Sequence, residues 1–300
     1  MFNNIVADIH RINPLVHCIT NYVSINDCAN ILLASGGAAI MAEDSQETEE
    51  ITALCSGLNI NIGMINDNKL NAMLLAGKKA NELNHPVVLD PVGMGASEYR
   101  TRAALTIIDN IRLTAIRGNI SEMKAIAKVV NESKSNINNL LYNPESKGVE
   151  VSDIDRVTED NLSEAVRFAR TLARQLDTVI CMTGRIDVVT DGRVVYCIRN
   201  GNPMMGKVTG EGCQLSALTT AYVTAVHSIM NEDNAADDKE IVRAAAAAVC
   251  VMGISGEIAY ERMGRLDGNA SYRNYIIDAV YNMTDEILED RCRVEVMNYE

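Results

Sequence analysis

The residues best suited to chemistry lie in the short segment 208–218. Gly210 and Gly212 run into a helix of small and apolar residues, so the backbone N–H groups of Gly210, Gly212 and Cys213 are unpaired at a helix start. Such a start binds anions, because the free donors and the positive end of the helix dipole point the same way. The same field is expected to lower the pKa of the Cys213 thiol. The pattern indicates phosphoryl transfer; a plain glycine turn before a buried helix with an inert cysteine is the alternative.

Two carboxylates are candidates for a divalent cation. Asp90 ends an apolar run that starts at Pro86, and Glu122 lies in the first turn of a helix that follows the next apolar run. Mg²⁺ takes few protein ligands, keeps several waters and binds phosphate oxygens, so two carboxylates from separate strand ends suit it. Each residue also has a structural alternative: Asp90 as a turn residue, and Glu122 as a complement to the helix dipole.

Two further strand ends could contact phosphate. Arg117 could pair with a phosphate, although a structural ion pair is the common role of such an arginine. Thr183, followed by Gly184, offers a hydroxyl and a tight turn for a nucleotide phosphate, and a plain turn is the alternative. Because ligands bind outside the carboxyl ends of the strands in open α/β sheets, these residues are expected to meet there.

One motif is misleading. Residues 201–207 satisfy the pattern G-x-x-x-x-G-K, but Val208 stands where a phosphate-binding loop needs Ser or Thr, and Pro203 removes a backbone donor. The helix is also expected to start after Gly210 and not at Lys207. We therefore reject a P-loop. A G-x-G-x-x-G fingerprint is absent as well, since Glu98 follows Gly93 and Gly95 at the third position.

Short apolar runs alternate with longer amphipathic stretches, which predicts an α/β protein with a mostly parallel sheet and helices on its faces. The predicted strands are 15–19, 58–63, 86–91, 114–118, 178–183, 187–190 and 193–196, the last two joined by an Asp-Gly turn. The predicted helices are 24–34, 67–83, 119–130 with Asn119 as its cap, 160–176, 211–230, 238–262 and 272–288. Residues 131–155 are expected to form a polar surface loop. We expect one domain over residues 1–300.

Composition limits the partners and the compartment. A formal net charge of −13 argues against nucleic acid and anionic membranes, which need a basic surface. The eight cysteines form no C-x-x-C pair and lie mostly in apolar runs, which is typical of reduced thiols in the cytoplasm. The first eleven residues lack the apolar core of a secretion signal, and the uncharged run 244–256 is short for a membrane span.

An ordered set of motifs gives a family resemblance. The motifs are 15–23 (LVHCITNYV), 39–42 (AIMA), 61–63 (NIG), 88–93 (VLDPVG), 116–122 (IRGNISE) and 208–213 (VTGEGC). Together they resemble hydroxyethylthiazole kinase, a thiamine-salvage enzyme of the ribokinase-like superfamily. The resemblance runs in order from about residue 14 to 218, and more weakly from Ala270 onward. It implies a three-layer fold in which helices cover both faces of a mostly parallel sheet.

The resemblance also implies a reaction and residue roles. The reaction is ATP-dependent phosphorylation of the primary alcohol of 4-methyl-5-(2-hydroxyethyl)thiazole, and Cys213 takes the place of a catalytic aspartate found in many relatives. The implied contacts are Met41, Gly210, Asn21 and Gly63 for the thiazole; Arg117, Thr183 and Gly212 for ATP; and Asp90 and Glu122 for Mg²⁺. The family forms homotrimers with thiazole pockets between subunits.

One departure from the family pattern leaves alternatives open. Glu211 replaces the small or hydroxyl residue usual between the two glycines, and its carboxylate either repels phosphate or points outward and complements the helix dipole. A hydroxymethylpyrimidine-type kinase of the same superfamily is the nearest rival function. A catalytically weak thiazole-binding pseudo-enzyme is the second, with Glu211 as its only indication.

Overall fold

The centre of the molecule is a single β-sheet. The computed structural model describes residues 1–138, 157–233 and 238–299, and within them nine strands pair in the order β2-β1-β3-β4-β5-β6-β7-β8-β9. All pairs from β2 to β6 are parallel, and β7, β8 and β9 are antiparallel to their neighbours. The bounds are β1 Leu15–Ile19, β2 Ala38–Ile40, β3 Gly57–Asn61, β4 Val87–Asp90, β5 Ala115–Asn119, β6 Val179–Thr183, β7 Asp187–Thr190, β8 Val194–Ile198 and β9 Val294–Asn298. The predicted mostly parallel sheet is confirmed.

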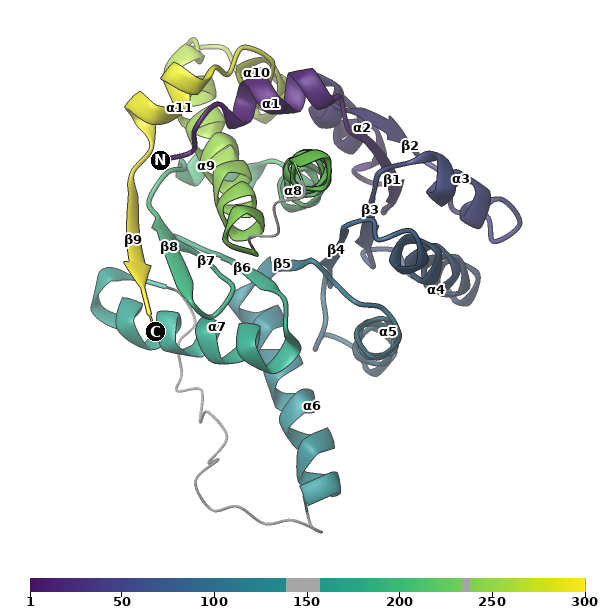
Figure 1. Cartoon of the computed structure of the whole chain (residues 1–300). Coiled ribbons are helices and arrows are strands. Elements are labelled where there is room, and N and C mark those ends of the chain that lie inside the picture. Colours follow the sequence, from purple (N-terminus) through teal and green to yellow (C-terminus); the bar gives the residue numbers. More distant parts are fainter. Residues whose placement is uncertain (139–156, 234–237, 300) are drawn as a thin grey trace.

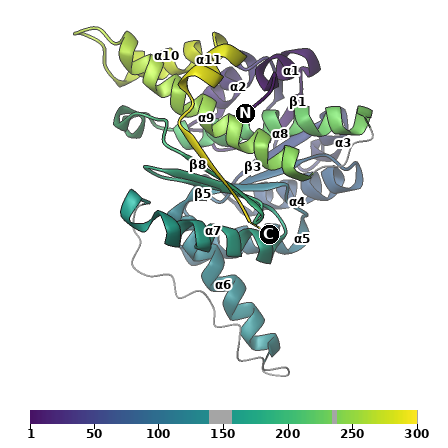
Figure 2. The same cartoon turned by 60° about the vertical axis from the view of Figure 1, so that its left-hand side comes forward.

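Helices cover both faces of the sheet, which gives three layers (Figure 1, Figure 2). One face carries α8 and α9, with α1, α2, α10 and α11 packed around them, and the other face carries α4 to α7. The bounds are α1 Ile5–Ile12, α2 Ile25–Ala34, α3 Thr48–Leu54, α4 Asp67–Glu82, α5 Glu98–Asn110, α6 Ile120–Asn138, α7 Leu162–Leu176, α8 Glu211–Asp233, α9 Asp238–Arg262, α10 Asn269–Tyr281 and α11 Asp285–Arg291. The predicted three-layer α/β architecture is confirmed.

The two helices that cover the centre of one face are apolar on most sides. In α9 the run Ala244 to Ala248 is fully buried, as expected of a helix surrounded by other elements. By length and composition α9 could cross a membrane, yet 78% of its apolar window is buried inside the protein, where it contacts β6, β7 and β8. These contacts account for its apolar composition as that of a core helix.

Two predictions about the elements are wrong. The expected loop after residue 130 begins as helix, because α6 continues to Asn138 through a stretch without Gly or Pro; residues 139–156 lie outside the described part. The predicted helix 272–288 is two helices, and Oγ1 of Thr284 accepts from the backbone N of Ile287 at the start of the second. Five elements were not predicted, namely α1, α3, α5, β2 and β9. Strand β9 mixes apolar and polar residues and pairs with β8 at the sheet edge.

Candidate active site

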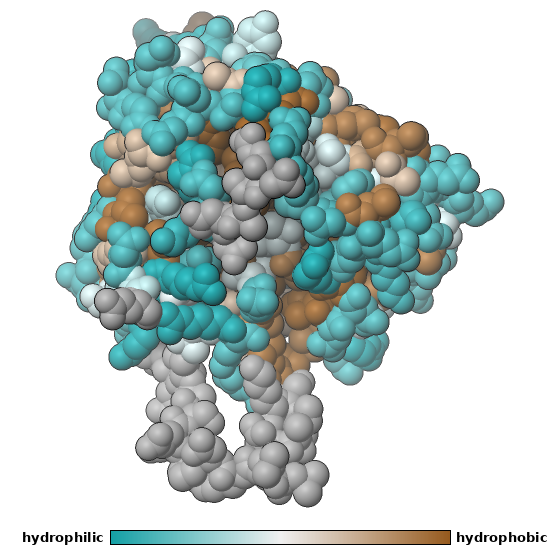
Figure 3. Space-filling view, viewed as in Figure 1, coloured by the Kyte–Doolittle hydropathy of each residue, from teal (hydrophilic) through white to brown (hydrophobic). Residues whose placement is uncertain are grey.

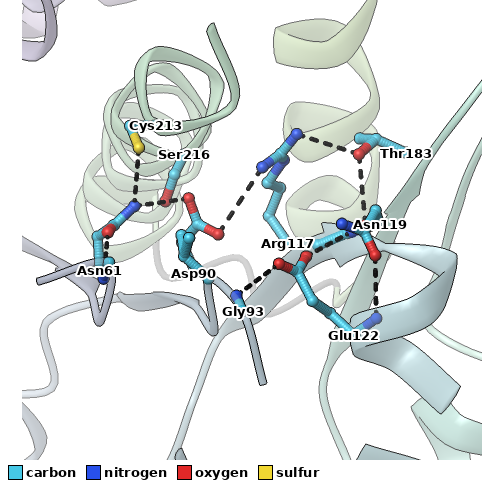
Figure 4. Close-up of polar contacts among 12 residues, drawn as sticks. Asn61, Asp90, Gly93, Arg117, Asn119, Glu122, Thr183, Cys213 and Ser216 are labelled. Atoms are coloured by element: carbon cyan, nitrogen blue, oxygen red, sulfur yellow. Dashed lines mark hydrogen bonds and ion pairs between the residues drawn. The ribbon is translucent and has the colours of Figure 1, made fainter. Parts of the chain in front are cut away.

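The carboxyl ends of the parallel strands bring most of the predicted residues together (Figure 4). Asp90 is the last residue of β4, Arg117 lies in β5 and Thr183 ends β6. Cys213 faces them from the first turn of α8, which begins at Glu211. Because parallel strands point the same way, their ends share one edge, and this is where open α/β sheets bind ligands.

Asp90 is fully buried, and only one of its oxygens has a hydrogen bond. Oδ2 accepts from Nδ2 of Asn61 at 2.7 Å, whereas Oδ1 has no hydrogen-bond partner and lies 3.7 Å from Nη1 of Arg117. Burial raises the pKa of this carboxyl, and the Arg117 charge opposes the rise. An unpartnered buried oxygen is costly, so Oδ1 is suited to a cation or to the water of a hydrated cation. The described residues contain no group of three His, Cys, Asp or Glu arranged for a metal.

Glu122 combines a structural role with a place beside Asp90. Its Oε1 accepts from the backbone N of Gly93 at 2.9 Å, and its Oε2 from the backbone N of Asn119 at 2.8 Å. Oδ1 of Asn119 accepts in return from the backbone N of Glu122 at 3.0 Å, so the two residues form a capping box and Asn119 caps α6 as predicted. The nearby charge of Glu122 also raises the pKa of Asp90.

Arg117 and Thr183 line a cavity of about 640 Å³. Nη2 of Arg117 donates to Oγ1 of Thr183 at 3.1 Å, and Nε of Arg117 is buried without a partner. The guanidinium lies on the first turn of α8, where a Cβ placed on Gly212 would be 2.4 Å from Nη1. The three residues predicted for phosphate binding therefore lie together.

Glu211 lines the same cavity. It is half-buried, burial raises the pKa of its carboxyl, and Arg117 opposes the rise. Of the two alternatives left open for Glu211, the outward orientation is wrong. The segment from Gly201 to Gly206 borders the cavity too, but the 3₁₀-helix Pro203–Lys207 forms there and α8 starts later, which confirms that it is not a P-loop.

Cys213 is buried and accepts two hydrogen bonds. Nδ2 of Asn21 lies 3.0 Å and Nδ2 of Asn61 lies 3.2 Å from its Sγ. Burial and the Asp90 charge raise the pKa of the thiol, and the polar groups around the sulfur, Asn21 and Asn61 among them, lower it less. The expectation of a lowered pKa is therefore wrong, because desolvation and a neighbouring carboxylate outweigh the helix start. All eight cysteines are unpaired in the structure, as predicted.

Three of the four residues predicted for the acceptor alcohol, Asn21, Gly63 and Gly210, lie in the cluster around Cys213. A Cβ placed on Gly63 would lie 2.8 Å from Nδ2 of Asn21. Gly210 has a φ of +79°, and a Cβ there would lie 2.7 Å from the Cβ of Ser24, whose Oγ donates to Oδ1 of Asn21 at 3.1 Å. A side chain at either position would collide with a neighbouring residue, so both positions require glycine. Met41 follows β2 on the same sheet edge and is half-buried, but no described hydrogen bond joins it to this cluster.

Two buried polar residues of the site were not singled out from the sequence. Asn61 ends β3 and contacts both Asp90 and Cys213. Lys69 of α4 is 2% exposed; its Nζ donates to the carbonyl of Thr20 at 2.8 Å and lies 2.7 Å from Oε2 of Glu43. The signal for Asn61 was available, since a polar side chain that ends an apolar strand must find a buried partner.

A larger cavity, of about 830 Å³, lies at the opposite, amino-terminal end of the strands. Its lining includes His85, Arg112, Asp177 and Asp191. Its lining includes no residue predicted for substrate, nucleotide or metal. The candidate site is therefore the smaller cavity together with the buried cluster beside it.

The comparisons with known proteins agree with this geometry. The pyridoxal kinase from Staphylococcus aureus, solved with AMP-PCP and pyridoxal, has a TM-score of 0.54 at 14% identity, covering 95% of this chain and 99% of that one, and shows the fold alone. The hydroxyethylthiazole kinase structure from Pyrococcus horikoshii has a TM-score of 0.79 at 30% identity, covering 98% and 99%. The three-layer fold is that of ribokinase-like kinases.

The sequence comparisons narrow the class. Residues 6–286 match the family described as hydroxyethylthiazole kinase. Hydroxyethylthiazole kinase from Clostridium acetobutylicum is 46% identical over 295 residues, covering 98% of this chain and 99% of the relative. The chain belongs to the hydroxyethylthiazole kinase family, as its motifs predicted. It is an enzyme, a kinase of this family.

Proposed function

We propose that this chain transfers the γ-phosphoryl group of ATP to the primary alcohol of 4-methyl-5-(2-hydroxyethyl)thiazole, in thiamine biosynthesis or salvage. Family membership supports this acceptor. The observation that carries it is the buried cluster in which Asn61 contacts both Asp90 and Cys213, beside the cavity of about 640 Å³ lined by Arg117. A proton acceptor, an unpartnered carboxylate oxygen and a cationic cavity wall are thus neighbours.

The two halves of the site would hold the two substrates. Asn21, Gly63, Gly210 and Met41 are assigned to the thiazole, on the side of β1, β2 and β3. Arg117, Thr183 and Gly212 are assigned to the phosphates of ATP, on the side of β5 and β6. Cys213 lies where the two halves adjoin. This arrangement, with the alcohol and the nucleotide on either side of Cys213, supports an in-line attack of the alcohol on the γ-phosphorus.

Asp90 and Glu122 are assigned to Mg²⁺. Oδ1 of Asp90, which accepts no hydrogen bond, and the nearby carboxylate of Glu122 offer hard oxygen ligands, which Mg²⁺ prefers. When bound, Mg²⁺ neutralises charge on the phosphate oxygens. Arg117 holds the same phosphates from its cavity wall, and the backbone N–H groups at the start of α8 donate to the group in transfer.

Cys213 is assigned the proton of the acceptor alcohol. As the new O–P bond forms and the bond to ADP breaks, the hydroxyl proton passes to Sγ. A thiolate is a far weaker base than an alkoxide, so the proton moves late, when the alcohol oxygen has become acidic. Positioning and charge neutralisation, more than proton transfer, would therefore account for most of the rate.

We also propose a cytoplasmic homotrimer with sites between subunits. Several large apolar side chains are exposed on the elements around the thiazole side, at Tyr22 (53%), Val23 (61%), Leu33 (59%) and Met64 (43%). Figure 3 shows hydrophobic surface on the side of the molecule where α2 lies. Such a patch suits burial against a second copy. Light scattering coupled to size exclusion would show one species three times the chain mass of 32.7 kDa.

ADP release from ATP and Mg²⁺ tests the function directly, with the thiazole alcohol, hydroxymethylpyrimidine or no acceptor. Turnover with the thiazole alone is expected. Preference for the pyrimidine would assign the chain to the rival kinase. If neither alcohol is phosphorylated while the thiazole still raises the melting temperature, the chain is a binding protein and the proposal is wrong.

A further inference from the structure

Asn61 is the residue around which the hydrogen bonds of the site are arranged (Figure 4). It is fully buried, and its Nδ2 donates to Oδ2 of Asp90 at 2.7 Å and to Sγ of Cys213 at 3.2 Å. Its Oδ1 accepts from the backbone N of Gly63 at 2.9 Å and from Nδ2 of Asn21 at 3.2 Å. An amide offers two hydrogens and two lone pairs, so its whole capacity is used within the site.

These partners fix the direction of the amide. The backbone N–H of Gly63 can only donate, so the atom facing it is Oδ1. A carboxylate oxygen of Asp90 accepts, so the atom facing it is Nδ2. With both ends determined, the sulfur of Cys213 receives an N–H from Asn61 and a second one from Asn21 at 3.0 Å. The sulfur is therefore held as an acceptor of hydrogen bonds.

The same amide decides which oxygen of Asp90 is available. Asn61 occupies Oδ2, and Oδ1 is left without a hydrogen bond on the side of Arg117, which lines the nucleotide cavity. Without Asn61, either carboxylate oxygen could turn toward Cys213, where two acceptors would repel each other. One side chain thus sets the orientation of two groups that belong to different halves of the site.

We propose that Asn61 is a positioning residue for phosphoryl transfer: it holds the Cys213 sulfur toward the acceptor alcohol and turns Oδ1 of Asp90 toward the nucleotide. The inference rests on the proposed kinase function. Its role differs from that of an ordinary buried polar residue, because a structural amide would affect stability without a matching effect on turnover.

The chain offers a matched control in Asn59. It lies two residues earlier on β3, on the same face of the strand, and is also fully buried. Its Oδ1 accepts from Oγ of Ser216 in α8 at 2.7 Å, so it also contacts the helix that carries Cys213. The described hydrogen bonds of Asn59 do not reach Asp90 or Cys213. Asn59→Leu therefore measures how much stability is lost when a buried asparagine beside α8 is replaced, without a change in the contacts of Asp90 or Cys213.

Kinetics of the two variants test the inference. Asn61→Leu is expected to lower kcat for the thiazole alcohol by about 10- to 100-fold, the value of one or two hydrogen bonds to charged or reacting groups. Asn59→Leu is expected to lower the melting temperature while keeping kcat within about twofold. If Asn61→Leu does not fold, the smaller Asn61→Ser replaces it, with the same expectation. Equal losses of kcat in both variants would overturn the proposal.

A double-mutant cycle with Cys213→Ala locates the partner. If Asn61 acts partly through the sulfur, the combined loss is smaller than the product of the two single losses by at least about threefold. If the two losses multiply, Asn61 does not act through Cys213. The part of the proposal in which Asn61 positions the sulfur would then be wrong.

Alkylation of Cys213 by iodoacetamide needs no turnover, so it separates failure of this inference from failure of the kinase function. The modified peptide is followed by mass spectrometry in the wild type and in Asn61→Leu. Loss of an N–H donor to sulfur leaves less thiolate and slows alkylation by about 3- to 10-fold. A merely loosened structure would expose the thiol and speed its alkylation. The faster rate contradicts the positioning role.

Discussion

The guanidinium of Arg117 lies directly against Gly212. A Cβ at residue 212 would be 2.4 Å from Nη1 and 2.9 Å from Nη2, closer than such atoms can approach. Thr183 holds the guanidinium from the other side through the hydrogen bond from Nη2, and Asp90 lies 3.7 Å from Nη1. Arg117 therefore reaches the start of α8 only because residue 212 has no side chain.

Gly212→Ala is expected to weaken ATP binding. The added methyl group displaces Arg117 from the helix start, so the KM for ATP should rise about tenfold, the value of one charge-assisted hydrogen bond. The KM for the alcohol should change less, since Arg117 lies on the nucleotide side. Gly268→Ala is the control, because a Cβ at Gly268 meets nothing within 4 Å. An unchanged KM for ATP in Gly212→Ala would contradict the role of Arg117.

Glu211→Thr should improve ATP binding. Glu211 lines the cavity proposed for the nucleotide, where its carboxylate interacts with the charge of Arg117 and would repel the phosphates of ATP. Removing one negative charge should lower the KM for ATP by about 3- to 10-fold, and the effect should shrink as salt is added. Glu98→Thr is the control, because Glu98 also begins a helix but is exposed. A higher KM for ATP would mean that Glu211 serves the nucleotide, for instance through its metal.

The raised pKa of Cys213 predicts the pH dependence of turnover. Only the thiolate accepts the alcohol proton, and a raised pKa leaves the thiol protonated at neutral pH, so kcat should rise with pH, at most about tenfold per unit. Cys213→Asp should be at least as active at pH 7 with a flatter profile, because a carboxyl ionises at lower pH than this thiol. Cys213→Ala should keep partial activity. Loss of all turnover in a folded Cys213→Asp protein would exclude Cys213 as proton acceptor.

Much of the site could be predicted from the sequence, because strand ends leave a local signal. Pro91 stops the apolar run before it at Asp90, and Gly118 ends the run that carries Arg117. Once the sheet is known to be parallel, such ends must meet. The glycines at 210 and 212 likewise mark a helix start by composition alone.

The features that the sequence did not predict depend on contacts between residues that are distant in sequence. The pKa of Cys213 depends on Asp90, which lies more than a hundred residues earlier, and on burial, so the helix start alone gave the wrong direction. The side chain of Glu211 could face solvent or the cavity, and only the packing decided this. Strand β9 was missed because a short edge strand of mixed polar and apolar residues resembles a polar tail until β8 lies beside it.

Lys69→Met is expected to weaken binding of the acceptor alcohol. The Lys69 ammonium joins the loop after β1, through the carbonyl of Thr20, to the loop after β2, through Glu43, and it lies 4.2 Å from the centre of the Tyr22 ring. Tyr22 also donates a hydrogen bond to Glu43. These two loops carry Asn21 and Met41, both assigned to the thiazole. Without the ammonium, the carboxylate of Glu43 loses its ion pair and the loops separate more easily.

The KM for the thiazole alcohol should therefore rise about tenfold in Lys69→Met, while the KM for ATP stays within about twofold. Lys79→Met on the same helix is the control: Lys79 pairs with Glu82 at 3.0 Å on the exposed side, where an ion pair contributes little. Lys69→Arg keeps the charge but is bulkier in a buried position, so partial recovery is expected. A role confined to the two loops would raise the KM for the alcohol alone. If both KM values rose equally, Lys69 would support the fold as a whole and not the two loops.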